Sequence, residues 1–186
     1  MNFRSFIAVP IHATPAIQAA LAELGKMGRR LKLVEPDNLH ITVKFLGETA
    51  PHQEGPIVNV LDRMVGRFSA EEFHFRGLGV FSDQTRPTVC WAGIANTDPI
   101  QGWHRFIENE LRDLGFTPDR YSYRPHLTLA RIRGRPPRQF SSVLERYAAN
   151  DFGSRKATEI TWFRSDLTPN GPRYRVLHRA KLRGAG

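Results

Sequence analysis

Two short segments of the chain place a threonine two residues after a histidine. They are Leu39-His-Ile-Thr-Val-Lys-Phe-Leu46 and Pro125-His-Leu-Thr-Leu-Ala-Arg-Ile132, which share the order His, apolar, Thr, apolar. Side chains at positions i and i+2 of a β-strand point to the same face. His40 and Thr42 would therefore lie side by side on one strand, and His126 and Thr128 on the other.

The apolar residues that alternate with the histidine and threonine indicate what the opposite face of each strand contacts. Ile41, Val43 and Phe45 would face a hydrophobic core on the first strand, as would Leu127 and Leu129 on the second. Each strand would then have one polar and one apolar face. If the two strands face each other across a cleft, that cleft contains two imidazoles and two hydroxyls.

Two histidines and two hydroxyls suit the hydrolysis of a phosphodiester. Imidazole titrates near pH 6.5, so one ring can be neutral while the other is charged. The neutral ring accepts a proton from water and the charged ring donates one to the leaving oxygen, each contributing about 10²–10⁴-fold. Hydroxyls can bind the non-bridging oxygens. This chemistry needs no metal and no cofactor. One His-x-Thr-x segment is common in strands, so the hypothesis depends on the two copies together.

Helical and strand-like segments interleave along the chain. The predicted helices are Thr14–Arg30, Gln53–Arg67, Asp98–Leu114 and Gln139–Ala149; the predicted strands are Phe3–Pro10, Leu39–Leu46, Glu72–Phe81, Thr88–Ile94, His126–Arg131, Lys156–Arg164 and Arg173–Leu182. Several connections between strands are too short for parallel crossovers. We therefore expect an α+β fold of mostly antiparallel sheets with helices packed outside.

Length and composition limit the class of protein. With 186 residues, the chain is expected to form a single domain over 1–186, in which the two motifs mark related lobes. Cys90 is the only cysteine, which excludes an internal disulfide and a Cys-based zinc site. No apolar run is long enough to span a membrane. We expect a cytoplasmic protein that does not contact membranes, with a monomer as the default.

Positive charge permits a partner that carries phosphate. The net charge is +9, and excess Lys and Arg attract polyanions. The segment Arg131-Ile-Arg-Gly-Arg-Pro-Pro-Arg138 carries four arginines, and basic residues alternate with Tyr174, Val176 and His178 in the last strand. Either region can guide RNA or can simply be solvated, and for the last strand a charge-protected sheet edge is favoured.

The motifs resemble those of the 2H phosphoesterase superfamily, and more narrowly the RNA 2′,3′-cyclic phosphodiesterases, also called 2′-5′ RNA ligases. The resemblance extends over most of the chain. It includes Phe3–Pro10, both His-x-Thr segments, the hairpin Arg76-Gly-Leu-Gly-Val-Phe81 with Arg86-Pro-Thr-Val-Cys-Trp-Ala-Gly93, and Ser165-Asp-Leu167 with Gly171-Pro-Arg-Tyr-Arg-Val176. It implies a bilobal fold with two antiparallel sheets lining a central cleft.

The resemblance also implies residue roles. His40 matches the proton donor and His126 the proton acceptor, while Thr42 and Thr128 match hydroxyls that bind phosphate. The implied reaction converts a 2′,3′-cyclic phosphate at an RNA end, such as a tRNA fragment or a nucleotide, to a 2′-phosphate without metal. Arg131 matches a family arginine that binds substrate.

Three cations near the motifs differ in their predicted positions. Strict alternation places Arg131 on the face of Leu127 and Leu129, so it reaches phosphate only if the strand bulges or ends near Ala130. Lys44 has the parity of Thr42, but it lies two residues further along the strand, which favours a position outside the cleft. Arg124 has the parity of His126 and is kept extended by the proline that follows.

Three other functions are alternatives. A 2′-5′ RNA ligase would run the same chemistry in reverse with the histidine roles exchanged. A non-catalytic RNA- or nucleotide-binding module is disfavoured because binding alone would tolerate Lys or Arg at the histidine positions. A metal hydrolase is disfavoured because acidic residues are scarce beside either histidine. The aromatic residue that would stack on a base is open among Phe81, Trp91 and Tyr123.

Overall fold

The structure is a computed structural model that describes residues 1–83, 86–169 and 171–185. The strands are β1 (Phe3–Pro10), β2 (Leu31–Leu33), β3 (His40–Thr49), β4 (Glu71–Asp83), β5 (Arg86–Ile94), β6 (His126–Ile132), β7 (Asp151–Ala157), β8 (Glu159–Thr168) and β9 (Gly171–Lys181). The helices are α1 (Pro15–Gly25), α2 (Glu54–Arg67), α3 (Asp98–Arg112) and α4 (Gln139–Arg146), with short 3-10 turns η1 (Pro36–Asn38) and η2 (Pro51–Gln53).

Within the described residues the strands form one curled sheet. Its order is β7-β4-β5-β6-β3-β1-β8-β9, and β2 pairs with the part of β6 beyond β3. Every pairing between these strands is antiparallel. The central strands β3 and β6 share only the pair Ile41 and Leu127. The two expected sheets are therefore halves of one sheet, joined at that pair.

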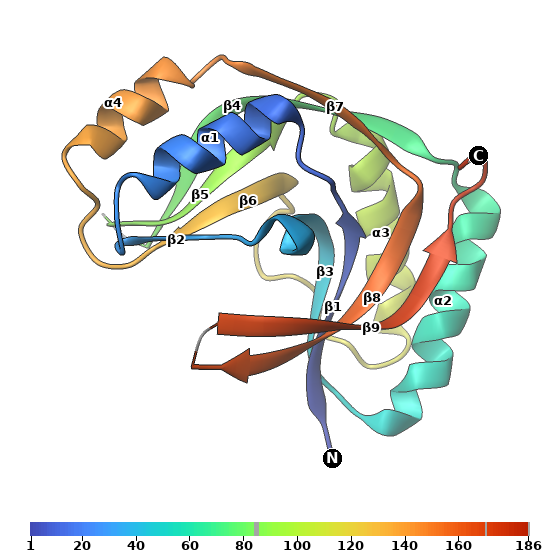
Figure 1. The fold of residues 1–186 in the computed structure, drawn as a ribbon. Helices are drawn as coiled ribbons and strands as arrows, with labels where there is room; N and C mark the ends of the chain where they lie inside the picture. The colour runs from blue at the N-terminus through green and yellow to red at the C-terminus, as the bar shows by residue number, and fades with distance from the viewer. Residues whose placement is uncertain (84–85, 170, 186) are drawn as a thin grey trace.

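The helices cover the outer side of each half of the sheet (Figure 1). Helix α1 packs against β2 and β7, whereas α2 packs against β9 and α3 against β3. Buried side chains of the sheet and helices, among them Ile7, Ile41, Phe73 and Trp103, form the core between these layers. The α+β class with antiparallel strands and outer helices is thus confirmed.

Most predicted elements differ from the observed ones by a few residues at their ends, and two differ more. Helix α1 begins as predicted, with Thr14 Oγ1 accepting the amide of Ile17 at 3.1 Å, but it ends at Gly25. Gly28, with φ +81°, turns the chain so that Leu31 begins β2 against β6. The predicted strand Lys156–Arg164 is two strands, because the chain passes near Thr158 from the β4 edge of the sheet to the β1 side.

No helix in the part of the chain that the structure describes combines the length and the apolar character needed to cross a membrane.

Candidate active site

The two His-x-Thr strands lie next to each other at the junction of the sheet halves. Their shared pair joins Ile41 of β3 to Leu127 of β6, and both side chains are fully buried. The histidine and threonine of each motif flank that pair, so strand alternation directs all four side chains to the other face. One backbone pairing therefore brings the two motifs together.

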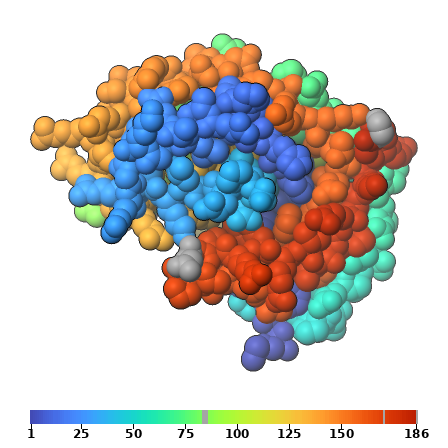
Figure 2. All heavy atoms as spheres, viewed as in Figure 1, coloured from blue at the N-terminus to red at the C-terminus, as the bar shows by residue number. Residues whose placement is uncertain are grey.

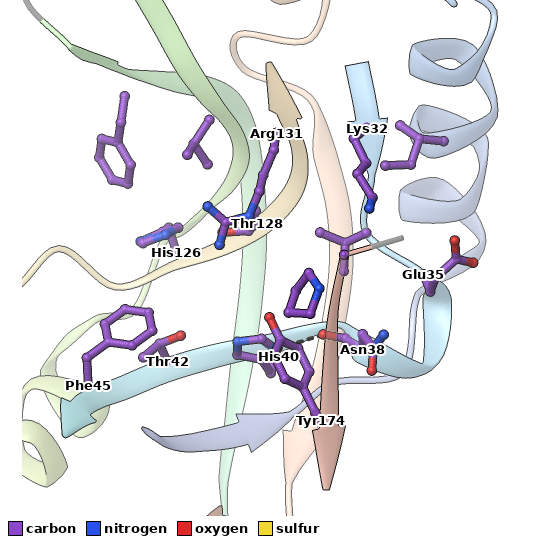
Figure 3. Close-up of a pocket in the computed structure, with 16 residues that line it drawn as sticks. Lys32, Glu35, Asn38, His40, Thr42, Phe45, His126, Thr128, Arg131 and Tyr174 are labelled. Carbon is purple, nitrogen blue, oxygen red and sulfur yellow. Dashed lines mark hydrogen bonds between the residues drawn. The ribbon is translucent and has the colours of Figure 1, made fainter. Parts of the chain in front are cut away.

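A cavity of about 340 Å³ opens on this face. It is lined by all five residues to which the family resemblance assigns a role: His40, Thr42, His126, Thr128 and Arg131. Figure 3 shows β3 and β6 presenting them from two sides. The aromatic rings of Phe45, Phe81 and Tyr174 and the side chain of Lys32 complete much of the wall.

The two imidazoles have the same hydrogen-bond arrangement. His40 Nδ1 lies 2.7 Å from the carbonyl oxygen of Asn38, and His126 Nδ1 lies 2.7 Å from that of Arg124. A carbonyl oxygen only accepts, so each Nδ1 donates and carries a proton. The neutral form of each ring then has its lone pair on Nε2. Nε2 is therefore the atom of each ring that can gain or lose a proton.

Burial favours the neutral form of both rings in the free protein. It lowers the pKa of His40 to about 4, opposed by the hydrogen bond to Asn38 and assisted by the positive charges of His126 and Arg131. Burial also lowers the pKa of His126, and the hydrogen bond to Arg124 opposes this shift. An anion in the cavity would favour the protonated form of each ring.

Aromatic rings produce much of this burial. His40 contacts Phe6, at 5.0 Å between ring centroids, and the edge-on ring of Tyr174, at 5.5 Å. Phe81 contacts His126 edge-on at 4.7 Å between ring centroids. The ring centroid of Trp91 lies 6.4 Å from that of His126. These contacts fix the orientation of both imidazoles.

A β-bulge brings Arg131 into the cavity. The pairing of β6 with β5 steps from Thr128–Trp91 to Ala130–Cys90, which leaves Leu129 without a partner. The extra residue reverses the alternation, so Leu129 and Ala130 are both buried and Arg131 faces the cavity. This is the bulge near Ala130 that the sequence analysis required.

Strand β3 carries the same bulge at the matching position. Its pairing with β1 steps from Thr42–Ala8 to Lys44–Ile7 and leaves Val43 without a partner. Lys44 is consequently buried at 2 % exposure, whereas Phe45 is 64 % exposed and lines the cavity. The expectation that Lys44 shares the face of Thr42 and the prediction that Phe45 faces the core are both wrong, because they assumed unbroken alternation.

Behind β3, the buried ammonium of Lys44 forms a charge cluster with two carboxylates. Its Nζ lies 2.7 Å from Glu108 Oε2 of α3 and 2.7 Å from Asp119 Oδ1, and it donates to the carbonyl of Thr117 at 3.1 Å. His104, Glu108 and Asp119 are close enough to hold a metal ion. The Lys44 ammonium already supplies the positive charge between the two carboxylates. None of these residues lines the cavity.

The segment before His126 is attached to the first motif. Tyr123 donates its hydroxyl to the carbonyl of Thr42 at 2.8 Å and stacks on His104 at 4.1 Å between ring centroids. Tyr123 therefore serves packing and hydrogen bonding behind β3, whereas Phe81 lies at the cavity. Arg124 is exposed, and its carbonyl accepts the His126 hydrogen bond.

Sequence reasoning missed Lys32 and Tyr174 as cavity residues. Lys32 lies on β2 directly opposite Arg131, but the helical pattern of residues 14–30 gave no sign of this short strand. Tyr174 had a usable signal, since its alternation with Arg173 and Arg175 predicts a face that points away from solvent.

A curled antiparallel sheet that presents two His-x-Thr strands to one cavity is the framework expected of a two-histidine phosphoesterase. The sequence model of the family described as LigT like Phosphoesterase matches residues 9–91 and 94–174. The chain belongs to the LigT-like phosphoesterase family.

Relatives of similar length support the assignment. The RNA 2′,3′-cyclic phosphodiesterase of Methanothermobacter thermautotrophicus is 31% identical over 177 residues, which cover 94% of this chain and 96% of the relative. The protein of that name from Methanocaldococcus jannaschii is 33% identical over 175 residues, covering 94% and 98%.

Solved structures agree with the fold. The protein TT0787 of Thermus thermophilus superimposes with a TM-score of 0.81 at 26% identity, covering 97% of this chain and 98% of that one. Escherichia coli LigT complexed with 3′-AMP gives a TM-score of 0.76 at 21% identity, covering 98% and 99%.

Proposed function

We propose that this protein hydrolyses the 2′,3′-cyclic phosphate at an RNA end to a 2′-phosphate, using two histidines as acid and base and no metal ion. One observation carries the proposal: both His-x-Thr pairs and Arg131 line the same cavity of about 340 Å³. The curated relatives named RNA 2′,3′-cyclic phosphodiesterase support the choice of substrate.

The cyclic phosphate binds between the two strands. It carries one negative charge, which the guanidinium of Arg131 and the hydroxyls of Thr42 and Thr128 are suited to receive at the non-bridging oxygens. Arg131 lies on the β6 side, and its counterpart on β3 is Phe45. This difference orients the anion toward β6 and leaves an apolar surface for the rest of the nucleotide.

Two proton transfers complete the reaction. Nε2 of neutral His126 accepts a proton as the water oxygen bonds to phosphorus. The bond from phosphorus to the 3′ oxygen breaks, and that oxygen takes a proton from Nε2 of protonated His40. The products are a 2′-phosphate and a 3′-hydroxyl. His126 then holds the proton and His40 is neutral, and exchange with solvent restores the starting state.

Because the histidines are buried, protonation of His40, the general acid, depends on the presence of substrate. The pKa of His40 is about 4 in the free protein, so few molecules hold this proton at neutral pH. A phosphate anion beside both rings offsets the desolvation and the repulsion from Arg131. Protonation of His40 is therefore favoured when a phosphate is present to be cleaved.

The pH dependence of kcat/KM should reflect these pKa values. The active free enzyme carries one proton on the histidine pair, so kcat/KM falls below the lower pKa and above the upper one. The lower limb is expected near pH 4 and the upper limb below pH 6.5, since burial lowers both values. The bound phosphate raises both pKa values, so kcat should be greatest at a higher pH than kcat/KM. Initial rates on a nucleoside 2′,3′-cyclic phosphate measure both profiles, and a kcat/KM that keeps rising above pH 7 would contradict the acid–base pair.

The product and its metal dependence test the function. Purified protein is incubated with a short RNA ending in a 2′,3′-cyclic phosphate, with and without EDTA, and the product is identified by the position of its phosphate. We expect a 2′-phosphate in equal yield under both conditions. A 3′-phosphate product would show that the leaving oxygen is wrongly assigned, and loss of turnover in EDTA would show that a metal ion takes part.

A further inference from the structure

A strip of positive charge begins at the cavity and runs away from it. We propose that this strip binds the backbone phosphates of an RNA strand upstream of its cyclic end, so that the preferred substrate is an oligonucleotide and not a mononucleotide. The inference rests on the proposed function and extends it to substrate length. The basic strip comprises Arg29, Arg30, Lys32, Arg131, Arg133, Arg135 and Arg138.

Strand pairing places the two halves of the strip together. Strand β2 pairs with β6 so that Lys32 lies opposite Arg131, and both side chains line the cavity. Two cations directly opposite each other repel, so the pair favours an anion between or beside them. This is the point at which the basic strip meets the cavity.

Hydrogen bonds continue the arrangement beyond the strands. The amide of Arg133 donates to the carbonyl of Arg30 at 2.7 Å, and Arg30 Nη1 donates to the carbonyl of Arg135 at 2.9 Å. Figure 2 shows residues 26–32, in blue, against residues 131–138, in light orange. Pro136 and Pro137 restrict the backbone of the loop after Arg135. The arginines are therefore carried by an ordered segment.

Five arginines of the strip have no acidic partner among residues 1–83, 86–169 and 171–185. Arg29, Arg30, Arg133, Arg135 and Arg138 are exposed. No ion pair joins any of these five to another residue that the structure describes, and neither 26–33 nor 131–138 contains an Asp or Glu. Their charge is therefore available to an anion from solution.

The basic residues of the last hairpin provide the contrast. Arg164 and Arg175 both pair with Asp166, at 2.7 and 3.0 Å, and Arg179 pairs with Glu159 at 3.4 Å. Those cations are held by acidic partners on the same hairpin. Arg173 and Lys181 of β9 have no ion pair among the described residues, so part of the charge of this hairpin, and not all of it as in the five arginines of the strip, is available to a polyanion.

The test compares two substrates with two matched variants. One substrate is a nucleoside 2′,3′-cyclic phosphate and the other is a ten-nucleotide single-stranded RNA with the same terminal group. The strip variant is Arg29→Gln/Arg133→Gln/Arg135→Gln, whose side chains lie outside the cavity. The control variant Arg4→Gln/Arg105→Gln/Lys181→Gln removes the same charge at exposed positions on β1, α3 and β9.

We expect the strip variant to lose about tenfold or more in kcat/KM on the oligonucleotide and to hydrolyse the mononucleotide within about twofold of wild type. Each phosphate contact on a single strand contributes about −0.7 to the slope of log(kcat/KM) against log salt. Removing three contacts should make that slope less negative by about 2 for the oligonucleotide alone. The control variant should change the two substrates equally.

Other outcomes separate the two proposals. If the strip variant and the control variant lose the same activity on the oligonucleotide, the basic strip does not bind RNA, although the cyclic phosphodiesterase activity stands. If the strip variant loses the same activity on the mononucleotide as on the oligonucleotide, the basic strip again does not bind the RNA strand. If wild-type protein hydrolyses neither substrate, the proposed function is wrong, and this inference is wrong with it.

Discussion

Replacing either cavity histidine by alanine is expected to lower kcat on a 2′,3′-cyclic phosphate by about 10²–10⁴-fold. Both imidazoles line the cavity, and both hold Nε2 free by donating Nδ1–H to a backbone carbonyl at 2.7 Å. The losses should not add in the double variant, since one proton transfer without the other leaves the step incomplete. Single-turnover rates measure the loss. The matched control is His52→Ala on exposed η2, which should stay within about twofold.

The pH profiles of the two variants distinguish acid from base. Without His40 the reaction no longer needs a protonated ring, so residual kcat/KM should stop falling as pH rises. Without His126 it no longer needs a neutral ring, so the fall toward acid pH should disappear. If the two variants show the opposite pattern, His126 is the proton donor and His40 is the proton acceptor. A His40→Ala or His126→Ala protein that is folded and keeps more than about one tenth of the wild-type rate would contradict the two-histidine mechanism altogether.

The alternation of polar and apolar residues was enough to predict that the histidine and threonine of both motifs meet. It was not enough to predict which other side chains line the cavity beside them. Alternation of polar and apolar residues places His40 and Thr42 on one face regardless of the partner strand. The positions that follow depend on bulges at Val43 and Leu129, which exist only because β1 and β5 pair with β3 and β6 in a particular register. The partner residues are distant in sequence, so a period-two pattern cannot show them.

The same reason explains the errors in the elements. Residues 31–33 form β2 because β6 offers backbone groups beyond its short pairing with β3, while the preceding helical pattern simply stops at glycine. Residues 156–164 contain no Gly, Pro, Asn or Asp that would indicate a turn, but near Thr158 the chain changes from pairing with β4 to pairing with β1. In each case a tertiary pairing decides a feature that local propensity leaves open.

Replacing Lys44 by methionine is expected to destabilise the protein by about 3–5 kcal/mol, toward the lower value. Methionine fills similar volume but leaves Glu108 and Asp119 without the ammonium that lies 2.7 Å from each. Asp119 is 35 % exposed, so water recovers part of its loss. Urea unfolding measures the change as a lower midpoint at constant slope. Lys156→Met, at an exposed position on β7, should change stability by less than about 0.5 kcal/mol.

The pH dependence of this loss identifies its cause. Burial on its own raises the pKa of Glu108, but hydrogen bonds from Lys44 and from the Asp119 amide lower it overall. That stabilisation is present above the unfolded pKa, about 4.3, and is lost as pH falls. Without Lys44, burial raises the pKa of Glu108 in the folded variant. The variant therefore loses stability above the pKa that Glu108 has in the unfolded chain, and it regains this stability as pH falls below that pKa. The two stability curves should therefore converge near pH 4, whereas a simple packing defect would keep them parallel.

Removing the carboxylates along with the lysine should restore most of the stability. The variant Lys44→Met/Glu108→Gln/Asp119→Asn leaves no buried charge unpaired, and replacing a whole ion cluster is far less costly than breaking it. The kcat of this triple variant shows whether the charge cluster only stabilises the fold or also positions His126. Lys44 also binds the carbonyl of Thr117, in the segment that leads through Tyr123 to His126. If the cluster only stabilises the fold, the restored protein recovers wild-type kcat; if the cluster also positions His126, stability returns while kcat stays reduced.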